Sequence, residues 1–154
     1  MIKDVKTSLG QKFNANDFIN SDKLPTINMG FDEVMLWLCR EFSHLNGIPC
    51  TYSTSIDENS MSKEVQLDIF RICQEALTNA MYHAAATKVE IRMKENQQKI
   101  ELTISDNGRG FDLHNDKQTP GFNNISERAS SINGVVDIET APGKGTRVRV
   151  QIGR

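Results

Sequence analysis

The sequence predicts an α+β fold, a two-layer α/β sandwich with helices on one face of a mixed, mainly antiparallel sheet. Apolar residues follow helical spacing over residues 31–45 and 62–85, and four later segments alternate apolar and polar residues as strands do. The 154 residues suit one domain with one core. We therefore expect the order helix, strand, long helix, strand, strand, loop, helix, strand, strand.

Composition narrows the classes of function. A net charge of −2 gives no reason to expect nucleic acid or an anionic membrane as a partner. The sequence contains no apolar run long enough to span a bilayer and no signal-peptide pattern, although a longer parent protein could carry a membrane anchor. Cys39, Cys50 and Cys73 lack metal-binding spacing, so we expect reduced structural thiols in a cytoplasmic protein.

The beginning of the chain separates into two parts. Residues 1–29 have no sustained period and predict an irregular lead-in, which places the domain at residues 30–154. The helix over residues 31–45 should end at Asn46-Gly47, because glycine readily takes the left-handed conformation that closes a helix. A short strand over residues 50–56 is expected next.

The long helix carries two stripes of side chains. Ser62 is a plausible N-cap, and the pattern runs to about Ala85. One stripe is apolar and predicts a core face. The other mixes acids, amides and an aromatic residue, which is less common than Lys/Glu pairs on a merely solvated face. This second stripe consists of Asp68, Arg71, Glu75, Asn79 and Tyr82, with His83 at its edge.

A β-hairpin follows and delivers an acidic residue at its end. Residues 87–93 and 99–105 alternate apolar and polar residues, and the polar stretch 95–98 joins them. Residues 106–110, DNGRG, come directly afterwards. The glycines let the backbone approach a ligand closely, and the carboxylate could accept a hydrogen bond from an exocyclic amine such as that of adenine. Taken alone, an ordinary Asn-Gly turn explains this motif equally well.

The last third predicts a lid, a helix and a second hairpin. The polar loop 111–120 is long enough to act as a lid. Gly121 precedes a short helix over residues 122–132, and such a helix N-terminus is a ready phosphate site. The turn 141–145, APGKG, joins two strands and lacks the spacing of a phosphate-binding P-loop, which we therefore reject.

Together these segments resemble the ATP-binding catalytic domain of sensor histidine kinases, within the gyrase, Hsp90, histidine kinase and MutL superfamily that shares the Bergerat fold. The resemblance covers about residues 29–154 and is closest to kinases paired with NarL-type response regulators. QEALTNAMYHA, residues 74–84, looks like the N box of that family. By this match Asn79 would coordinate Mg²⁺, Glu75 would orient water or the metal shell, and His83 would approach the phosphates.

The first glycine box of the family is matched by DNGRGFD, residues 106–112. The match implies that Asp106 accepts a hydrogen bond from the adenine amine. Gly108 and Gly110 would let the chain wrap around the base.

Two further glycine boxes are matched in order. GFNNISERA, residues 121–129, resembles the second box, whose backbone amides, beginning with Gly121 and Phe122, would hold phosphate. GKGT, residues 143–146, resembles the terminal box, in which Thr146 would support the adenine-binding carboxylate.

The chain also departs from the family pattern. None of its three histidines, His44, His83 and His114, lies in the helix motif that carries the phospho-accepting histidine. That histidine and the dimerisation helices are therefore expected outside this chain. The other departures are Thr119 and Asn124 where the family has glycine, Ile125 where it has methionine, and Tyr82 where it has a basic residue.

The resemblance implies that the domain binds magnesium ATP and donates the γ-phosphoryl group to a histidine on separate dimerisation helices, in two-component signalling with a NarL-type response regulator. Alone, the domain should bind ATP but turn it over poorly. Two alternatives stay open: a protein serine kinase of the anti-sigma type, and a binding module without catalysis. A gyrase- or MutL-type enzyme is not expected, because it needs a second domain.

Overall fold

The computed structural model describes residues 29–81, 85–110 and 122–153. Most of the predicted lead-in and the predicted lid lie outside these ranges. The described helices are α3 (Phe31–Asn46), η1 (Glu58–Ser60, a 3₁₀ turn), α4 (Lys63–Asn79) and α5 (Phe122–Ser131), and the strands are β1 (Cys50–Thr54), β2 (Val89–Asn96), β3 (Lys99–Asp106), β4 (Gly134–Thr140) and β5 (Thr146–Gly153).

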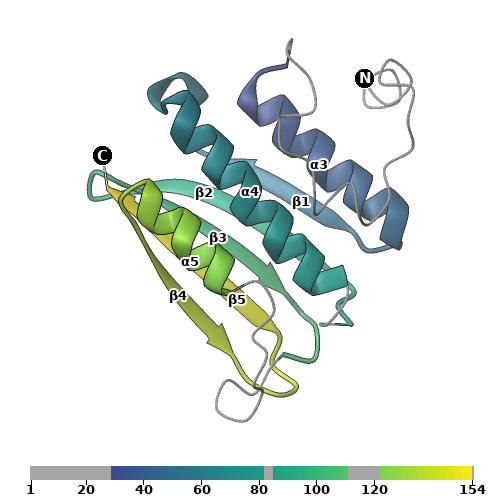
Figure 1. Cartoon of the computed structure of the whole chain (residues 1–154). Coiled ribbons are helices and arrows are strands. Elements are labelled where there is room, and N and C mark those ends of the chain that lie inside the picture. The colour runs from purple at the N-terminus through teal and green to yellow at the C-terminus, as the bar shows by residue number, and fades with distance from the viewer. Residues whose placement is uncertain (1–28, 82–84, 111–121, 154) are drawn as a thin grey trace.

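The described strands form one five-stranded sheet in the order β1-β2-β3-β5-β4. β1 runs parallel to β2, and the other neighbours are antiparallel. Figure 1 shows α3, α4 and α5 side by side on one face of this sheet. The predicted fold class and order of elements are confirmed. None of the helices in the described ranges is both long and apolar enough to cross a bilayer.

The core lies between the sheet and this helix layer. Ile69, Ile72 and Leu77 of α4 are fully buried, as are Leu102 of β3 and Val150 of β5. The helix-facing residues of β2, β3 and β5 alternate with exposed or polar ones, which is the pattern of a sheet covered on one face. The described part of the chain therefore leaves the other face of the sheet without a helix.

Capping contacts account for the start of α4 and the end of α3. The Ser62 side chain accepts a hydrogen bond from the Val65 amide at 3.2 Å, which confirms the predicted N-cap of α4. Gly47 takes a left-handed φ of 66° and its amide bonds to the Ser43 carbonyl, so the predicted stop of α3 is also confirmed.

Three element boundaries differ from the prediction. β1 ends at Thr54, because the Thr54 hydroxyl accepts the hydrogen bond of the Ile56 amide at 3.0 Å. The long helix ends before Ala85, which has a left-handed φ of 50°. The hairpin linker is a turn of Gln97 and Gln98, both with positive φ, rather than the predicted stretch 95–98.

Candidate nucleotide site

Asp106 lies at the end of the central strand, where three parts of the chain meet. The register places it opposite Val89 of β2 on one side and Thr146 of β5 on the other. Its carboxylate accepts a hydrogen bond from the Gly108 amide at 2.8 Å. The turn after β3 therefore holds the carboxylate in one orientation, as the candidate adenine acceptor requires.

Burial sets the protonation behaviour of Asp106. Removal from water raises the pKa of its carboxyl group, while backbone hydrogen bonds from Gly108 and Thr146 lower it, and the net shift is upward from the ordinary value of 3.8. The folded chain thus holds a partly desolvated carboxylate whose ionised form would gain from an added hydrogen-bond donor. The exocyclic amine of adenine is such a donor.

The two glycine segments contact each other through their backbones. Gly145 has φ 73°, and a Cβ built on it would lie 2.3 Å from the Asp106 carbonyl oxygen. Gly110 has φ 70°, and its Cβ would lie 2.0 Å from the Ala141 carbonyl oxygen. Only glycine fits these two positions, because both the space and the left-handed conformation exclude a side chain. The role of Gly110 is therefore to admit the terminal turn at close range.

Thr146 is buried beside Asp106 and has a hydroxyl partner that sequence analysis did not identify. Its Oγ1 lies 2.9 Å from the Oγ1 of Thr140. The Thr140 hydroxyl also donates to the Gly145 carbonyl at 3.1 Å. This pair lies next to the turn of the β4–β5 hairpin, where Thr140 and Thr146 are opposite each other. The alternation of the two strands and the short turn between them could have predicted that these two threonines meet.

Asn107 is a second residue whose role sequence analysis missed. Its side-chain oxygen accepts hydrogen bonds from the Thr87 and Lys88 amides, each at 2.9 Å. Its amide nitrogen donates to the Thr87 hydroxyl at 2.8 Å. Asn107 thus ties the segment after Asp106 to the start of β2, so the DNG motif does more here than make an ordinary turn.

Asn79 is the last residue of α4 and is 6% exposed. Its side-chain nitrogen has no hydrogen-bond partner within the described part of the chain. The next two residues, Ala80 and Met81, form a π-helical turn, a feature frequent at functional sites. Buried polar groups are nearly always paired, so an unpartnered amide at the end of the helix indicates a position that a ligand completes.

Glu75 lies one turn before Asn79 and is half-buried. Its Oε1 accepts a hydrogen bond from the Asn124 side chain of α5 at 3.2 Å. Asn124 stands where the resembled family has glycine, and the structure gives it this positioning contact. The predicted pair of Glu75 and Asn79 therefore lies on one face of α4, next to the first turn of α5.

The first two members of the polar stripe, Asp68 and Arg71, serve the packing of α4. Asp68 pairs with Arg128 of α5 at 3.5 Å and accepts from the Ser131 hydroxyl at 3.0 Å. Arg71 is buried and donates to Gln74 at 2.9 Å, so it takes part in the packing of α4. The stripe divides into a structural first half and a candidate functional second half.

The start of α5 completes the described site. The Phe122 side chain is 5% exposed and belongs to the core. Figure 1 places the start of α5 at the same end of the molecule as the ends of α4 and β3. The predicted phosphate-site residues His83 and Gly121 lie outside the described residues, as do Tyr82 and Thr119.

The oxygen atoms near the end of α4 fit a magnesium ion that also binds phosphate. Asn79 and Glu75 offer an amide oxygen and a carboxylate, the oxygen ligands that Mg²⁺ takes. In the described ranges no group of three His, Cys, Asp or Glu side chains could hold a metal. Mg²⁺ commonly binds through one or two protein oxygens, waters and substrate phosphates, so this sparse set suits a nucleotide-borne ion.

A pocket of about 360 Å³ borders Asp106 on the side of the terminal turn. It is also lined by the turn residues Ala141, Lys144 and Gly145, and by Ser105, Glu139, Thr140, Thr146 and Arg147 at the adjoining strand ends. Its volume lies in the range of small-molecule sites. Asp106 is thus the residue shared by the glycine turns, the pocket and the end of the central strand.

Comparison with protein families agrees with this geometry. The family model described as histidine kinase-, DNA gyrase B- and HSP90-like ATPase matches residues 64–154, from the first turn of α4 onward. The chain belongs to this ATPase family. Membership implies that this domain binds ATP. The match includes every residue of the predicted N box and glycine boxes.

Sensor histidine kinases are among the relatives of this ATPase domain. Over 105 residues it is 36% identical to the sensor histidine kinase LiaS of Bacillus subtilis, a match that covers 68% of this chain and 29% of LiaS. Over 127 residues it is 29% identical to the oxygen sensor histidine kinase NreB of Staphylococcus carnosus, which covers 81% of this chain and 37% of NreB. The chain thus spans about a third of the length of these curated relatives.

Solved structures show the same fold. The histidine kinase domain of the blue-light activated kinase EL346 from Erythrobacter litoralis superposes with a TM-score of 0.66 at 17% identity, over 97% of this chain and 79% of that one. The Acinetobacter baumannii histidine kinase AdeS superposes with a TM-score of 0.61 at 15% identity, over 80% of this chain and 62% of that one. At such identities the comparison establishes the fold alone.

The close approach of Gly145 predicts a difference between two glycines of one turn. Both Gly145→Ala and Gly143→Ala place alanine at positive φ, but only at Gly145 does the new Cβ meet backbone. We expect Gly143→Ala to lower the free energy of unfolding by about 1 kcal/mol and Gly145→Ala by about 2–4 kcal/mol. Urea denaturation of both variants measures this, and equal losses would contradict the proposed backbone contact.

The raised pKa of Asp106 predicts a pH-dependent cost to stability. A folded-state pKa above the unfolded value means that the folded chain holds the proton more tightly, so stability falls as pH rises through the folded pKa. In the nucleotide-free chain we expect Asp106→Asn to raise the free energy of unfolding at about pH 7, with a gain that shrinks as the pH falls through the folded-state pKa.

The matched control is Asp137→Asn on β4, which alters one exposed ion pair to Arg149 at 4.0 Å. Such a pair contributes about 0–1 kcal/mol, so this variant should show no comparable gain. Denaturation curves across the pH series provide the measurement. An Asp106→Asn variant that is less stable than the parent at neutral pH would show that the ionised carboxylate is well satisfied without a ligand.

Proposed function

We propose that this domain binds magnesium ATP and donates the γ-phosphoryl group to a histidine on separate dimerisation helices of a sensor kinase. The buried side chain of Asn79 carries the proposal: its nitrogen, unpartnered in the described chain, can donate to a phosphate oxygen, and it ends α4 at the same end of the molecule as the fixed carboxylate of Asp106. One group suits the phosphate end of a nucleotide and the other suits the base.

Each described residue has a role in this proposal. Asp106 accepts the adenine amine, Thr146 supports it from the neighbouring strand, and the chain around Gly108 follows the base. Asn79 takes the metal through its amide oxygen, and Glu75, held by Asn124 at 3.2 Å, orients water or the metal shell. A Mg²⁺ ion held by Asn79 and Glu75 would supply positive charge that offsets the negative charge developing in transfer.

The transferred group leaves ADP and forms a bond to an imidazole nitrogen that this chain does not supply. In the proposal the chain therefore mainly positions ATP, as is general for phosphoryl transfer. The backbone amide of Phe122 and the predicted phosphate contacts of Gly121 and His83 belong to the same scheme. Like NreB and LiaS, the parent would be a sensor kinase. We place it with NarL-type regulators on the sequence resemblance, and its ATP site in the cytoplasm.

The first test is calorimetric titration of ATP with and without Mg²⁺. The unchanged chain should bind, and Asp106→Asn should lose about 1–3 kcal/mol of binding free energy, the scale for a hydrogen bond to a charged group. Asn79→Ala should remove the gain in affinity that Mg²⁺ gives. Asn59→Ala, at an exposed site on η1, serves as the control for the asparagine change. If the folded chain binds no ATP, the proposed function is wrong and the alternative of a non-catalytic binding module is favoured.

A second test identifies the acceptor. We expect the chain alone to hydrolyse ATP slowly and to label itself little, and the histidine-bearing helices of the parent protein to become phosphorylated when added. Phosphohistidine is lost in acid, whereas phosphoserine survives, so acid treatment of the labelled product separates the two kinases. Sustained hydrolysis by the chain alone that disappears in Asn79→Ala would count against transfer to an external histidine, as would an acid-stable label.

A further inference from the structure

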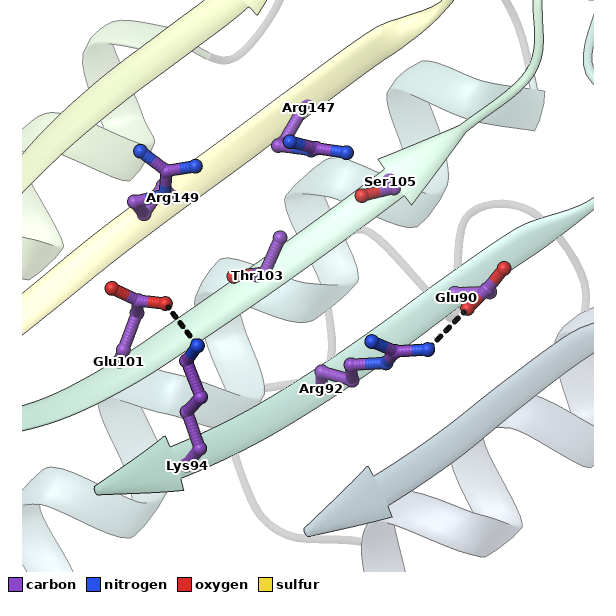
Figure 2. Close-up of a pocket in the computed structure, with 8 residues that line it drawn as sticks. All are labelled: Glu90, Arg92, Lys94, Glu101, Thr103, Ser105, Arg147 and Arg149. Carbon is purple, nitrogen blue, oxygen red and sulfur yellow. Dashed lines mark hydrogen bonds and ion pairs between the residues drawn. The ribbon is translucent and has the colours of Figure 1, made fainter. Parts of the chain in front are cut away.

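The sheet face opposite the helices carries a charged trough. Figure 2 shows its side chains, which come from β2, β3 and β5 and surround a hollow of about 400 Å³. The described helices all lie on the other face, so they leave this surface open (Figure 1). The lining residues are Glu90, Arg92 and Lys94 of β2, Glu101, Thr103 and Ser105 of β3, and Arg147 and Arg149 of β5.

The strand register gives the trough its shape. Thr103 of β3 lies between Arg92 of β2 and Arg149 of β5 in one row across the sheet. Ser105 lies between Glu90 and Arg147 in the next row. The short hydroxyl side chains form the floor, and the long side chains of β2 and β5 form walls two strand spacings, or about 10 Å, apart.

The charges in the trough favour an anionic group. Four cationic side chains line it against two carboxylates. Lys94 pairs with Glu101 at 3.5 Å and Arg92 with Glu90 at 3.4 Å, and both cations are well exposed. Exposed ion pairs of this kind contribute only about 0–1 kcal/mol each, so these side chains can exchange partners at little cost.

Arg147 is the cation most available to a partner. It is exposed, and it forms no ion pair with any residue of the described chain. Its cross-strand neighbour Glu139 pairs with Arg149 instead, at 3.5 Å. A carboxylate placed over Ser105 would therefore meet a free guanidinium fork and a hydroxyl donor together.

Glu101 shows that one end of the trough is electropositive. Burial alone would raise the pKa of its carboxyl group, but hydrogen bonds from Gln151 and Asn96 and the charges of Lys94 and Arg149 bring the net pKa below its ordinary value. Glu90 and Glu101 lie at opposite ends, so they would repel a continuous polyanion such as a nucleic acid backbone. A polypeptide with separated carboxylates can avoid the row of Glu101, and over Ser105 its carboxylate can lie on the Arg147 side, away from Glu90, which pairs with Arg92.

We infer that this trough is a docking surface for an extended acidic segment of a partner protein, with carboxylates on alternate residues. Successive rows of the trough are two residues apart along β3, about 6.8 Å, which equals the spacing of alternate side chains in an extended chain. One carboxylate then lies over Thr103 between Arg92 and Arg149, and the next lies over Ser105 beside Arg147. Bidentate arginine contacts give this match its specificity.

The docking surface lies mainly on the face of the sheet opposite the helices, but Ser105 and Arg147 also line the pocket that borders Asp106. Thr103 and Ser105 point away from the face to which Ile104 and Asp106 belong, because side chains alternate along a strand. An acidic partner over Ser105 and Arg147 would thus reach the edge of that pocket. Its binding should be sensitive to salt, since exposed charges carry it.

A short synthetic peptide of alternating glutamate and serine tests the inference on the whole chain. We expect it to shift the backbone amide NMR signals of Thr103, Ser105 and Arg149. Arg147→Glu should weaken binding by about tenfold or more, and the milder Arg147→Gln by about threefold or more. Arg40→Glu, which makes the same change of charge at an exposed position on α3, should leave the affinity within about twofold.

Several results of the same experiment would contradict the proposed docking surface. A peptide with lysine in place of glutamate should not bind. Absence of shifts in β3 and β5, equal losses in the Arg147 and Arg40 variants, or tighter binding of a single-stranded oligonucleotide would each overturn the proposed acidic protein partner. Circular dichroism confirms that each variant is folded.

Discussion

The contact between Gly145 and the backbone of Asp106 is the constraint on which the candidate site depends. The Asp106 carbonyl oxygen lies where any side chain at Gly145 would stand. This approach brings the start of β5 beside the end of β3 and aligns Thr146 with Asp106. Asn107 holds the same strand end from the other side, through the amides of Thr87 and Lys88. The carboxylate is thus fixed by main-chain contacts, which the helices do not provide.

The helix layer contributes a second, separate half of the site. Polar contacts between α4 and α5, at Asp68 and at Glu75, set the position of one helix on the other. Asn79 follows at the end of α4 with its amide nitrogen unpaired in the described chain. A nucleotide that reaches from Asp106 to Asn79 would join the two layers at one end of the molecule, so its binding would stabilise both layers together.

The fold could be predicted almost completely from the sequence, because apolar spacing identifies helices and strands directly. The ends of elements could not, since they depend on single contacts such as the Thr54 hydroxyl that ends β1. The motifs singled out Asp106 and Asn79 but did not explain why residue 110 is glycine. The explanation is the close approach of the Ala141 backbone, 31 positions later in the chain (141 − 110 = 31). Asn107, Thr140 and Asn124 act through partners distant in sequence, which a single sequence does not reveal.

Strand β3 serves both faces of the sheet with alternate residues. Leu102, Ile104 and Asp106 belong to the core and the nucleotide end, while Thr103 and Ser105 form the floor of the trough. Insertion or deletion of one residue within β3 would exchange these two sets, which would place hydroxyls in the core and the carboxylate on the charged face. Length variation in this hairpin is thereby confined to the Gln97-Gln98 turn or to steps of two residues. The residue register of β3 therefore determines both surfaces at once.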